Sequence, residues 1–179
     1  MLRIAIDLPT DANIVRTTFQ SNYHGTILAT QILIPLIRQG GRVVNVASMA
    51  GNLTSKYSSS VREAFLATKN VADVTKLMDT YLRAVENGTH EKEGWPSAAY
   101  SVSKSGVIGA TRAIAAEEKK KGSGILVNSC CPGYVVTDMT KGGGFKDVDQ
   151  GAQTPVLLAV GDIGGKTGEF WQNEIVKPW

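Results

Sequence analysis

The chain has 179 residues, of which 42% are hydrophobic and 20% are charged, and its formal net charge is +3 at pH 7. This length and composition are ordinary for one globular domain with a sizeable core, and they exclude a fibrous or a disordered protein. We therefore expect a single domain over residues 1–179.

The first predicted element is a long helix over residues 11–38, because apolar side chains recur there at helical spacing. Pro35 is expected to kink or end its last turn, and the Gly-Gly pair that follows should terminate it. Residues 41–48 are a short β-branched apolar run between glycines, which is typical of a strand buried on both faces of a parallel sheet. Ser48 stands at the carboxyl end of this strand, where open α/β sheets bind their ligands.

A long insert separates Ser48 from the next motif. It holds about 50 residues, far more than a loop between a strand and a helix needs. Residues 61–66 predict a short helix and residues 71–85 a clearly amphipathic one. We expect the apolar stripe of the second helix to pack against the body of the domain rather than to form a groove for a partner.

The helix after the insert carries Tyr100 and Lys104, which at a spacing of four residues lie on one face. A nearby ammonium group favours a phenolate and lowers its pKa, which suits the phenol to proton exchange with a carbonyl oxygen. Such a pair alone is weak evidence, because most are surface residues of a helix. A second strand pattern over residues 124–131 follows, however, so that this pair and Ser48 gather at the carboxyl ends of two strands.

The last predicted elements are a helix over residues 149–160 and a strand over residues 168–171. Strands and helices alternate along the chain, which indicates an α/β fold. We predict a partial Rossmann-like parallel sheet of about three strands, with flanking helices and a helical insert before the Tyr-x-x-x-Lys helix.

The remaining sequence signals argue against several classes of partner. Three lysines at residues 119–121 follow two glutamates at a helix end, where cations interact favourably with the helix dipole. No apolar run approaches the roughly 20 residues that span a bilayer, and residues 1–11 lack the core of a signal peptide. The two cysteines are adjacent, which favours reduced thiols over a disulfide framework. We expect a cytoplasmic protein that binds no nucleic acid, no membrane and, lacking any metal-ligand spacing, no metal.

Several blocks of the sequence resemble the short-chain dehydrogenase/reductase family and, within it, the carbonyl reductases. The matching blocks cover essentially the whole chain in the family's order: residues 21–26, 41–48, 94–104, 128–139 and 168–170. The resemblance implies a catalytic tetrad of Asn22, Ser48, Tyr100 and Lys104. It also implies a set of residues along the nicotinamide and its phosphates: Tyr100, Lys104, Pro132, Gly133, Val135 and Thr137.

The resemblance implies the NADPH-dependent reduction of ketones or aldehydes by hydride transfer. Tyr100 would donate a proton to the developing alkoxide, and Ser48 would hydrogen-bond the same oxygen. Lys104 would keep the pKa of the tyrosine low and bind the nicotinamide ribose, while Asn22 would position a water that links Lys104 to solvent.

The substrate of such a reductase would be a small carbonyl compound. Trp95 and Tyr134 would line an aromatic pocket for it, although either could equally belong to the core. The glycine-rich residues 141–145 resemble the mobile substrate loop of the family and could equally form a plain linker.

A glycine-rich turn for a dinucleotide is missing from these residues. Such a turn stands between a strand and a helix whose N-terminus receives the pyrophosphate, whereas the glycine clusters here lie at residues 142–144 and 161–165. Residues 1–7 stand roughly where the family's fourth strand ends, without its Asn-Asn-Ala-Gly signature. The chain thus resembles the C-terminal part of a carbonyl reductase, and its cofactor contacts would address the nicotinamide end only.

Two functions remain open from the sequence. The first is an NADPH-dependent carbonyl reductase, expected to be monomeric because, by resemblance to the monomeric carbonyl reductases, the insert would cover the dimer face. The second is a non-enzymatic truncated remnant that cannot bind the dinucleotide and acts through partner binding. For the 179-residue chain by itself we expect no measurable NADPH binding and an apolar strand edge at residues 43–47 that invites pairing between chains.

Overall fold

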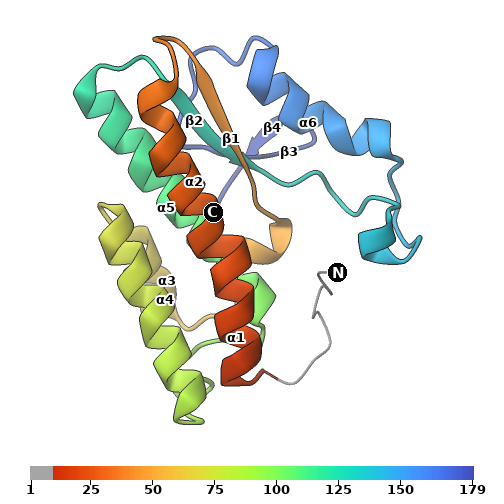
Figure 1. Cartoon of the computed structure of the whole chain (residues 1–179). Helices are drawn as coiled ribbons and strands as arrows, with labels where there is room; N and C mark the ends of the chain where they lie inside the picture. Colours follow the sequence, from red (N-terminus) through yellow and green to blue (C-terminus); the bar gives the residue numbers. More distant parts are fainter. Residues whose placement is uncertain (1–9) are drawn as a thin grey trace.

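The computed structural model describes residues 10–179, which form a four-stranded sheet between layers of helices (Figure 1). The strands lie in the order β1-β2-β3-β4. Their bounds are Arg42–Val46 for β1, Leu126–Cys130 for β2, Phe170–Gln172 for β3 and Ile175–Lys177 for β4. The first three strands are parallel, and β4 pairs antiparallel with β3. The carboxyl ends of the parallel strands therefore meet at one edge of the sheet, as in other open α/β proteins.

One nearly continuous helical stretch precedes β1, as predicted. Its parts are α1 (Ala12–Phe19), the π-helical segment η1 (Gln20–Gly25), α2 (Thr26–Leu33) and the 3-10 turn η2 (Ile34–Leu36). The stretch begins where the Asp11 carboxylate accepts the N–H groups of Asn13 and Ile14. It ends at the turn that contains Pro35, which confirms the predicted end. The π-helical segment was not predicted.

The insert is helical and packs against the domain, also as predicted. It contains α3 (Ser59–Leu66) and α4 (Val71–Glu86). The apolar stripe of α4 is buried against α1 and α5 (Ala99–Lys121), and it comprises Val74, Met78, Tyr81, Ala84 and Val85. The stripe therefore belongs to the core.

Helix α5 is the centre of the packing. It lies between the sheet on one side and α1 and α4 on the other. Small residues permit this: a Cβ at Gly106 would lie 2.6 Å from the sulfur of Met78 and 2.9 Å from the ring of Tyr23. The helix ends at Gly122, whose φ of 65° is a left-handed conformation that glycine adopts without strain.

The opposite face of the sheet is covered by α6 (Val148–Val160). A second, smaller core joins this helix to β2 and β3 through Leu158, Cys130 and Trp171. Arg42 ties the start of β1 to the end of α6, because its guanidinium donates to the carbonyl of Gly161 at 2.6 Å.

The sheet differs from the prediction in its fourth strand. β4 follows β3 through a tight turn in which Asn173 and Glu174 both have positive φ, 53° and 60°. This is the geometry of a two-residue hairpin, in which Glu is an unusual residue, so that the turn carried little sequence signal. Within the described residues β1 pairs only with β2, and Val46 at its end is 49% exposed. The expectation for residues 1–7 lies outside the described residues.

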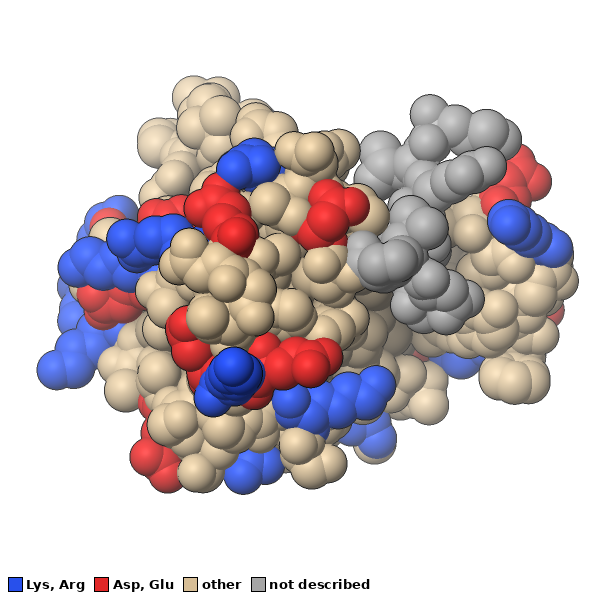
Figure 2. Space-filling view, turned by 90° about the horizontal axis from the view of Figure 1, so that it is seen from below, with Lys and Arg blue, Asp and Glu red and all other residues tan. Residues whose placement is uncertain are grey.

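Charged side chains of both signs are interspersed on the face of the molecule shown in Figure 2. One ion pair links elements far apart in sequence, since Arg16 of α1 bonds Glu86 at the end of α4. Among residues 10–179, no helix is both long enough and apolar enough to cross a bilayer.

Candidate active site

Ser48 lies on a short turn that is pressed against α5. It follows β1 after one residue, Ala47, and caps the one-turn 3-10 helix η3 (Met49–Gly51), where its hydroxyl accepts the N–H of Ala50 at 3.1 Å. The turn closes through Gly51, whose N–H donates to the carbonyl of Ser48 at 2.9 Å. Only glycine fits there, because a Cβ at position 51 would lie 2.6 Å from the carbonyl carbon of Lys104.

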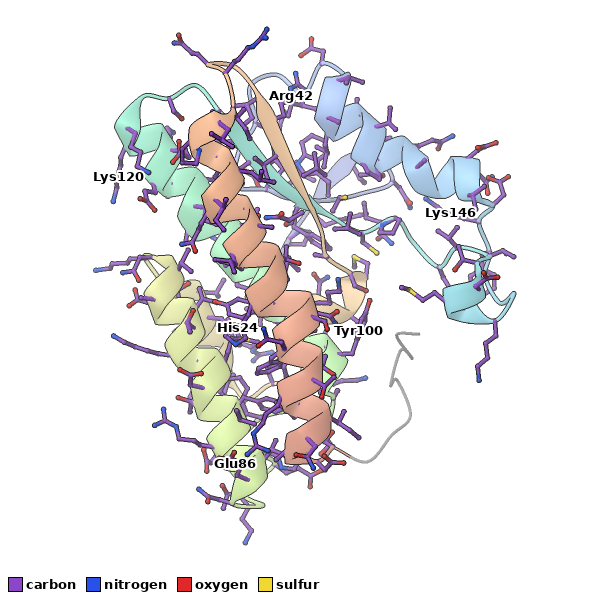
Figure 3. All side chains as sticks on the ribbon, viewed as in Figure 1. His24, Arg42, Glu86, Tyr100, Lys120 and Lys146 are labelled. Atoms are coloured by element: carbon purple, nitrogen blue, oxygen red, sulfur yellow. The ribbon has the colours of Figure 1, made fainter. Side chains whose placement is uncertain are left out.

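Tyr100 and Lys104 lie in the first turns of α5, beside the Ser48 turn. Figure 3 shows Tyr100 near the beginning of this helix. The side chain of Ser48 lies close enough to the Tyr100 phenol to lower its pKa. The ammonium of Lys104 donates to the carbonyl of Val46 at 2.9 Å and lies 5.7 Å from the centre of the Tyr100 ring. The structure thus brings together three of the four predicted catalytic residues at the carboxyl end of β1.

The proton of Tyr100 is held more firmly than the sequence suggested. Burial raises the pKa of the Tyr100 phenol above its ordinary value, and the side chain of Ser48 opposes this with a smaller effect. The net direction is thus opposite to the predicted one, and the Lys104 ammonium is directed to the Val46 carbonyl; a lowering contribution of Lys104 to this pKa stays a prediction. At neutral pH the phenol is protonated, which is the form that a proton donor needs.

Partial burial also changes the pKa of Lys104. Burial lowers the pKa of its ammonium, because the charged form loses solvation, and the nearby thiols of Cys131 and Cys130 act in the opposite direction. Cys131 also contributes to the shift at Tyr100. The end of β2 therefore borders the site, which sequence reasoning did not predict.

Asn22 is linked to the Tyr100 helix through a serine. It lies in the π-helical segment η1, and its side-chain amide donates to the hydroxyl of Ser103 at 3.1 Å. That hydroxyl donates to the carbonyl of Tyr100 at 2.7 Å. π-helical turns occur often at functional sites, so the irregular backbone agrees with a special role for this position. The role of Asn22 in placing a water stays a prediction.

The four predicted cofactor residues beyond α5 lie on the segment that leaves β2 after Cys131. Pro132 is followed by Gly133 at a φ of 96°, and a Cβ there would lie 3.0 Å from the side chain of Lys146. Val135 forms a bridge to Lys146. Thr137 caps the 3-10 turn η4 (Asp138–Thr140). These contacts fold residues 132–146 back on themselves, and Figure 3 shows Lys146 near the start of α6.

Trp95 and Tyr134 have different environments. Trp95 is 4% exposed and packs against Phe65 and Tyr81, with ring centres 5.9 and 5.4 Å apart, which favours the core alternative. Tyr134 is 50% exposed, and its ring lies 5.7 Å from that of Phe145 in the glycine-rich loop. A contact of either side chain with substrate stays a prediction.

The fold and this site can be compared with known proteins. The family model described as short chain dehydrogenase matches residues 5–83 and 84–144, well over half of the chain. The chain belongs to this family. Within it, the sequence is 37% identical to carbonyl reductase (NADPH) 3 of Rattus norvegicus over 97% of this chain, and 39% identical to carbonyl reductase (NADPH) 1 of Homo sapiens over 90%. These alignments span 65% and 61% of the length of the two relatives.

Two solved plant reductases share the architecture of this short-chain dehydrogenase. Salutaridine reductase from Papaver somniferum superposes on 90% of the chain with a TM-score of 0.80 and 28% identity, over 55% of its own length. Menthone neomenthol reductase from Mentha piperita superposes on 89% with a TM-score of 0.68 and 25% identity, over 50% of its own length.

Proposed function

We propose that this short-chain dehydrogenase reduces ketones or aldehydes to alcohols with NADPH, using Tyr100 as the proton donor. One observation carries the proposal: a half-buried, protonated phenol beside Ser48 at the carboxyl edge of the sheet. The relatives that match over most of the chain are named as NADPH-dependent carbonyl reductases, which supports both the substrate class and the cofactor.

The chain's own residues divide the chemistry at the carbonyl oxygen. NADPH, when bound, supplies a hydride to the carbonyl carbon. Tyr100 donates its proton to the oxygen as negative charge develops there, and Ser48 donates a hydrogen bond to the same atom. The ammonium of Lys104, 5.7 Å from the Tyr100 ring centre, stabilises the phenolate that remains.

The described residues fit one end of NADPH. Lys104 and Tyr100 would hold the nicotinamide and its ribose, together with the segment after β2: Pro132, Gly133, Val135 and Thr137. Glycine at position 133 leaves space beside the backbone for a ligand. A Cβ there would fill part of this space and would lie 3.0 Å from the side chain of Lys146. Residues 10–179 contain no glycine-rich turn between a strand and a helix to receive the pyrophosphate. We infer that this chain by itself binds NADPH no more tightly than reduced nicotinamide mononucleotide.

A second candidate is partner binding without catalysis. Its support is an apolar surface on α2 and η2 near β1, where Ile32 is 59% and Leu36 77% exposed and where β1 has no second partner strand among residues 10–179. Exposed apolar side chains next to an unpaired strand are a typical site of association.

One assay separates the two candidates. The 179-residue chain is mixed with an aromatic aldehyde, such as 4-nitrobenzaldehyde, and millimolar reduced nicotinamide mononucleotide, a hydride donor that needs no pyrophosphate or adenosine contacts. A reductase accelerates oxidation of the donor above the rate in buffer. A protein that acts only through partners leaves that rate unchanged.

A further inference from the structure

We propose that Trp179 is a positioning residue for Ser48, because it holds the turn that carries Ser48 against the Tyr100 helix. The role rests on the proposed reductase function. Trp179 is separated from this turn by well over a hundred residues, yet its indole N–H donates to the carbonyl of Gly51 at 2.9 Å.

The Gly51 carbonyl is the point at which three parts of the chain meet. It accepts a second hydrogen bond, at 2.9 Å, from the hydroxyl of Ser105 on α5. The Ser105 hydroxyl in turn lies 2.8 Å from the phenol oxygen of Tyr57. Ser105 directly follows Lys104, so the carbonyl that ends the Ser48 turn is fixed to the helix that carries the site. The indole adds a bond from a third element, beyond β3 and β4.

The indole ring itself is held on three sides. Gly109 leaves room for it, because a Cβ there would lie 3.1 Å from the edge of the ring. Phe65 of α3 meets it edge to face, with ring centres 5.9 Å apart and an angle of 75°. The guanidinium of Arg112 lies 5.1 Å from the ring centre, within the range of a cation–π interaction. The N–H is therefore presented to Gly51 from a fixed ring.

The consequence for Ser48 follows from the turn's own bonds. Ser48 and Gly51 are joined by the N–H···O bond that closes η3, and the N–H of Asn52 donates to Met49 at 3.1 Å. A turn that is free to move away from α5 carries the Ser48 hydroxyl away from Tyr100. Removing the indole donor should therefore reduce the rate of the chemical step and leave binding of the hydride donor unchanged.

The test uses the full 179-residue chain with Trp179→Phe, which keeps a ring but loses the donor. Trp171→Phe is the matched control, because the indole N–H of Trp171 is buried and bonds to no other residue among 10–179. Hydrogen exchange is followed at the amides of Gly51 and Asn52. We expect exchange there to rise about fivefold to tenfold in Trp179→Phe, the factor that one hydrogen bond represents, and to stay unchanged in the control.

Turnover with reduced nicotinamide mononucleotide gives the second readout. In Trp179→Phe, kcat should fall about fivefold to tenfold while the KM for the donor stays constant. If Trp179→Phe does not fold, Arg112→Ala replaces it, since this change loosens the ring but keeps the donor, and exchange at the same amides should still rise.

The two ways of failing can be told apart. Unchanged exchange at Gly51 and Asn52, or a rise no greater than in Trp171→Phe, overturns the positioning role whatever the activity. Absence of turnover in the unmodified chain speaks against the reductase instead, and the exchange measurement still decides what Trp179 does.

Discussion

The pKa of the Tyr100 phenol is set by opposed influences, of which burial is the largest. Burial raises the pKa of the phenol, and the side chain of Ser48 lowers it by a smaller amount. A donor that keeps its proton until charge develops on the substrate oxygen is well matched to reduction of a carbonyl. Ser48 therefore has two tasks, one at the substrate oxygen and one at the phenol.

Replacing Ser48 by alanine tests both tasks. In Ser48→Ala the pKa of Tyr100 should rise further, because the hydroxyl that stabilises the phenolate is lost, and kcat should fall about a hundredfold with the loss of an oxygen-stabilising donor. The pKa is followed by NMR of ¹³C-labelled tyrosine, and kcat is measured in the assay with reduced nicotinamide mononucleotide. Ser60→Ala, an exposed serine of α3, is the control. A Tyr100 pKa that is the same in Ser48→Ala as in the unmodified chain would refute the influence of Ser48 on the phenol.

At the scale of elements, the sequence predicts what local periodicity encodes. The long helix before β1, both insert helices, α5, α6 and the three parallel strands all follow from apolar spacing, β-branched runs and glycines. Strand β4 was not predicted, because it is only three residues long, is half-exposed and follows a turn that contains Glu174. The π-helical turn at Asn22 has no periodic signature of its own.

The candidate site was predictable in part for a similar reason. Ser48, Tyr100 and Lys104 stand at strand ends or at a fixed spacing on a helix, so that general rules place them together. The bond of Trp179 to Gly51 and the nearness of Cys131 depend on packing between distant segments, which no local pattern records. The direction of the Tyr100 pKa depends on burial and on where the Lys104 ammonium points, which spacing cannot specify.

A buried polar network joins three elements beneath the site. The side chain of Asn45 in β1 accepts from Thr30 of α2 at 3.1 Å and donates to Thr111 of α5 at 2.9 Å. We predict that Asn45→Ala lowers the free energy of unfolding by about 1–3 kcal/mol, because it removes two buried side-chain hydrogen bonds. Chemical denaturation measures this. Thr80→Ala, at an exposed hydroxyl of α4, should cost less than about 0.5 kcal/mol, and equal losses in both variants would show that the network adds nothing.

For the whole molecule, buried tyrosines set the stability at high pH. Burial raises the pKa of Tyr23 and Tyr81 to about 12. Groups with a raised folded pKa stabilise the fold fully below their unfolded pKa near 10, and this contribution is lost as pH rises through 12. We predict that the free energy of unfolding is constant from about pH 7 to 9. Between about pH 10 and 12 it should fall by about 2–3 kcal/mol per tyrosine.

Denaturation curves at stepwise pH provide the check. In Tyr81→Phe the free energy of unfolding should fall less steeply above pH 10. Tyr134→Phe, which changes a half-exposed ring, should leave this fall unchanged. A decline that begins below pH 9, or one that both variants share equally, would contradict this explanation.

The position of α4 has a consequence for assembly. Its apolar stripe covers α1 and α5, and the insert was expected, by the resemblance given in the sequence analysis, to cover the dimer face. We predict that a form of the protein with a complete cofactor-binding unit is monomeric. Sedimentation velocity measures this directly, and a stable dimer cross-linked through α1 and α5 would be the contrary result.

The central claim is that Tyr100 donates the proton in carbonyl reduction, and Tyr100→Phe tests it most directly. The measurement is the rate of 4-nitrobenzaldehyde reduction by reduced nicotinamide mononucleotide in the unmodified chain, in Tyr100→Phe and in Tyr81→Phe, a core tyrosine whose hydroxyl donates to the carbonyl of Pro96. We predict that Tyr100→Phe is slower by about 10²–10⁴, the contribution of a general acid, while its affinity for the donor and the rate of Tyr81→Phe stay near those of the unmodified chain. Equal rates in the unmodified chain and in a folded Tyr100→Phe variant would contradict it.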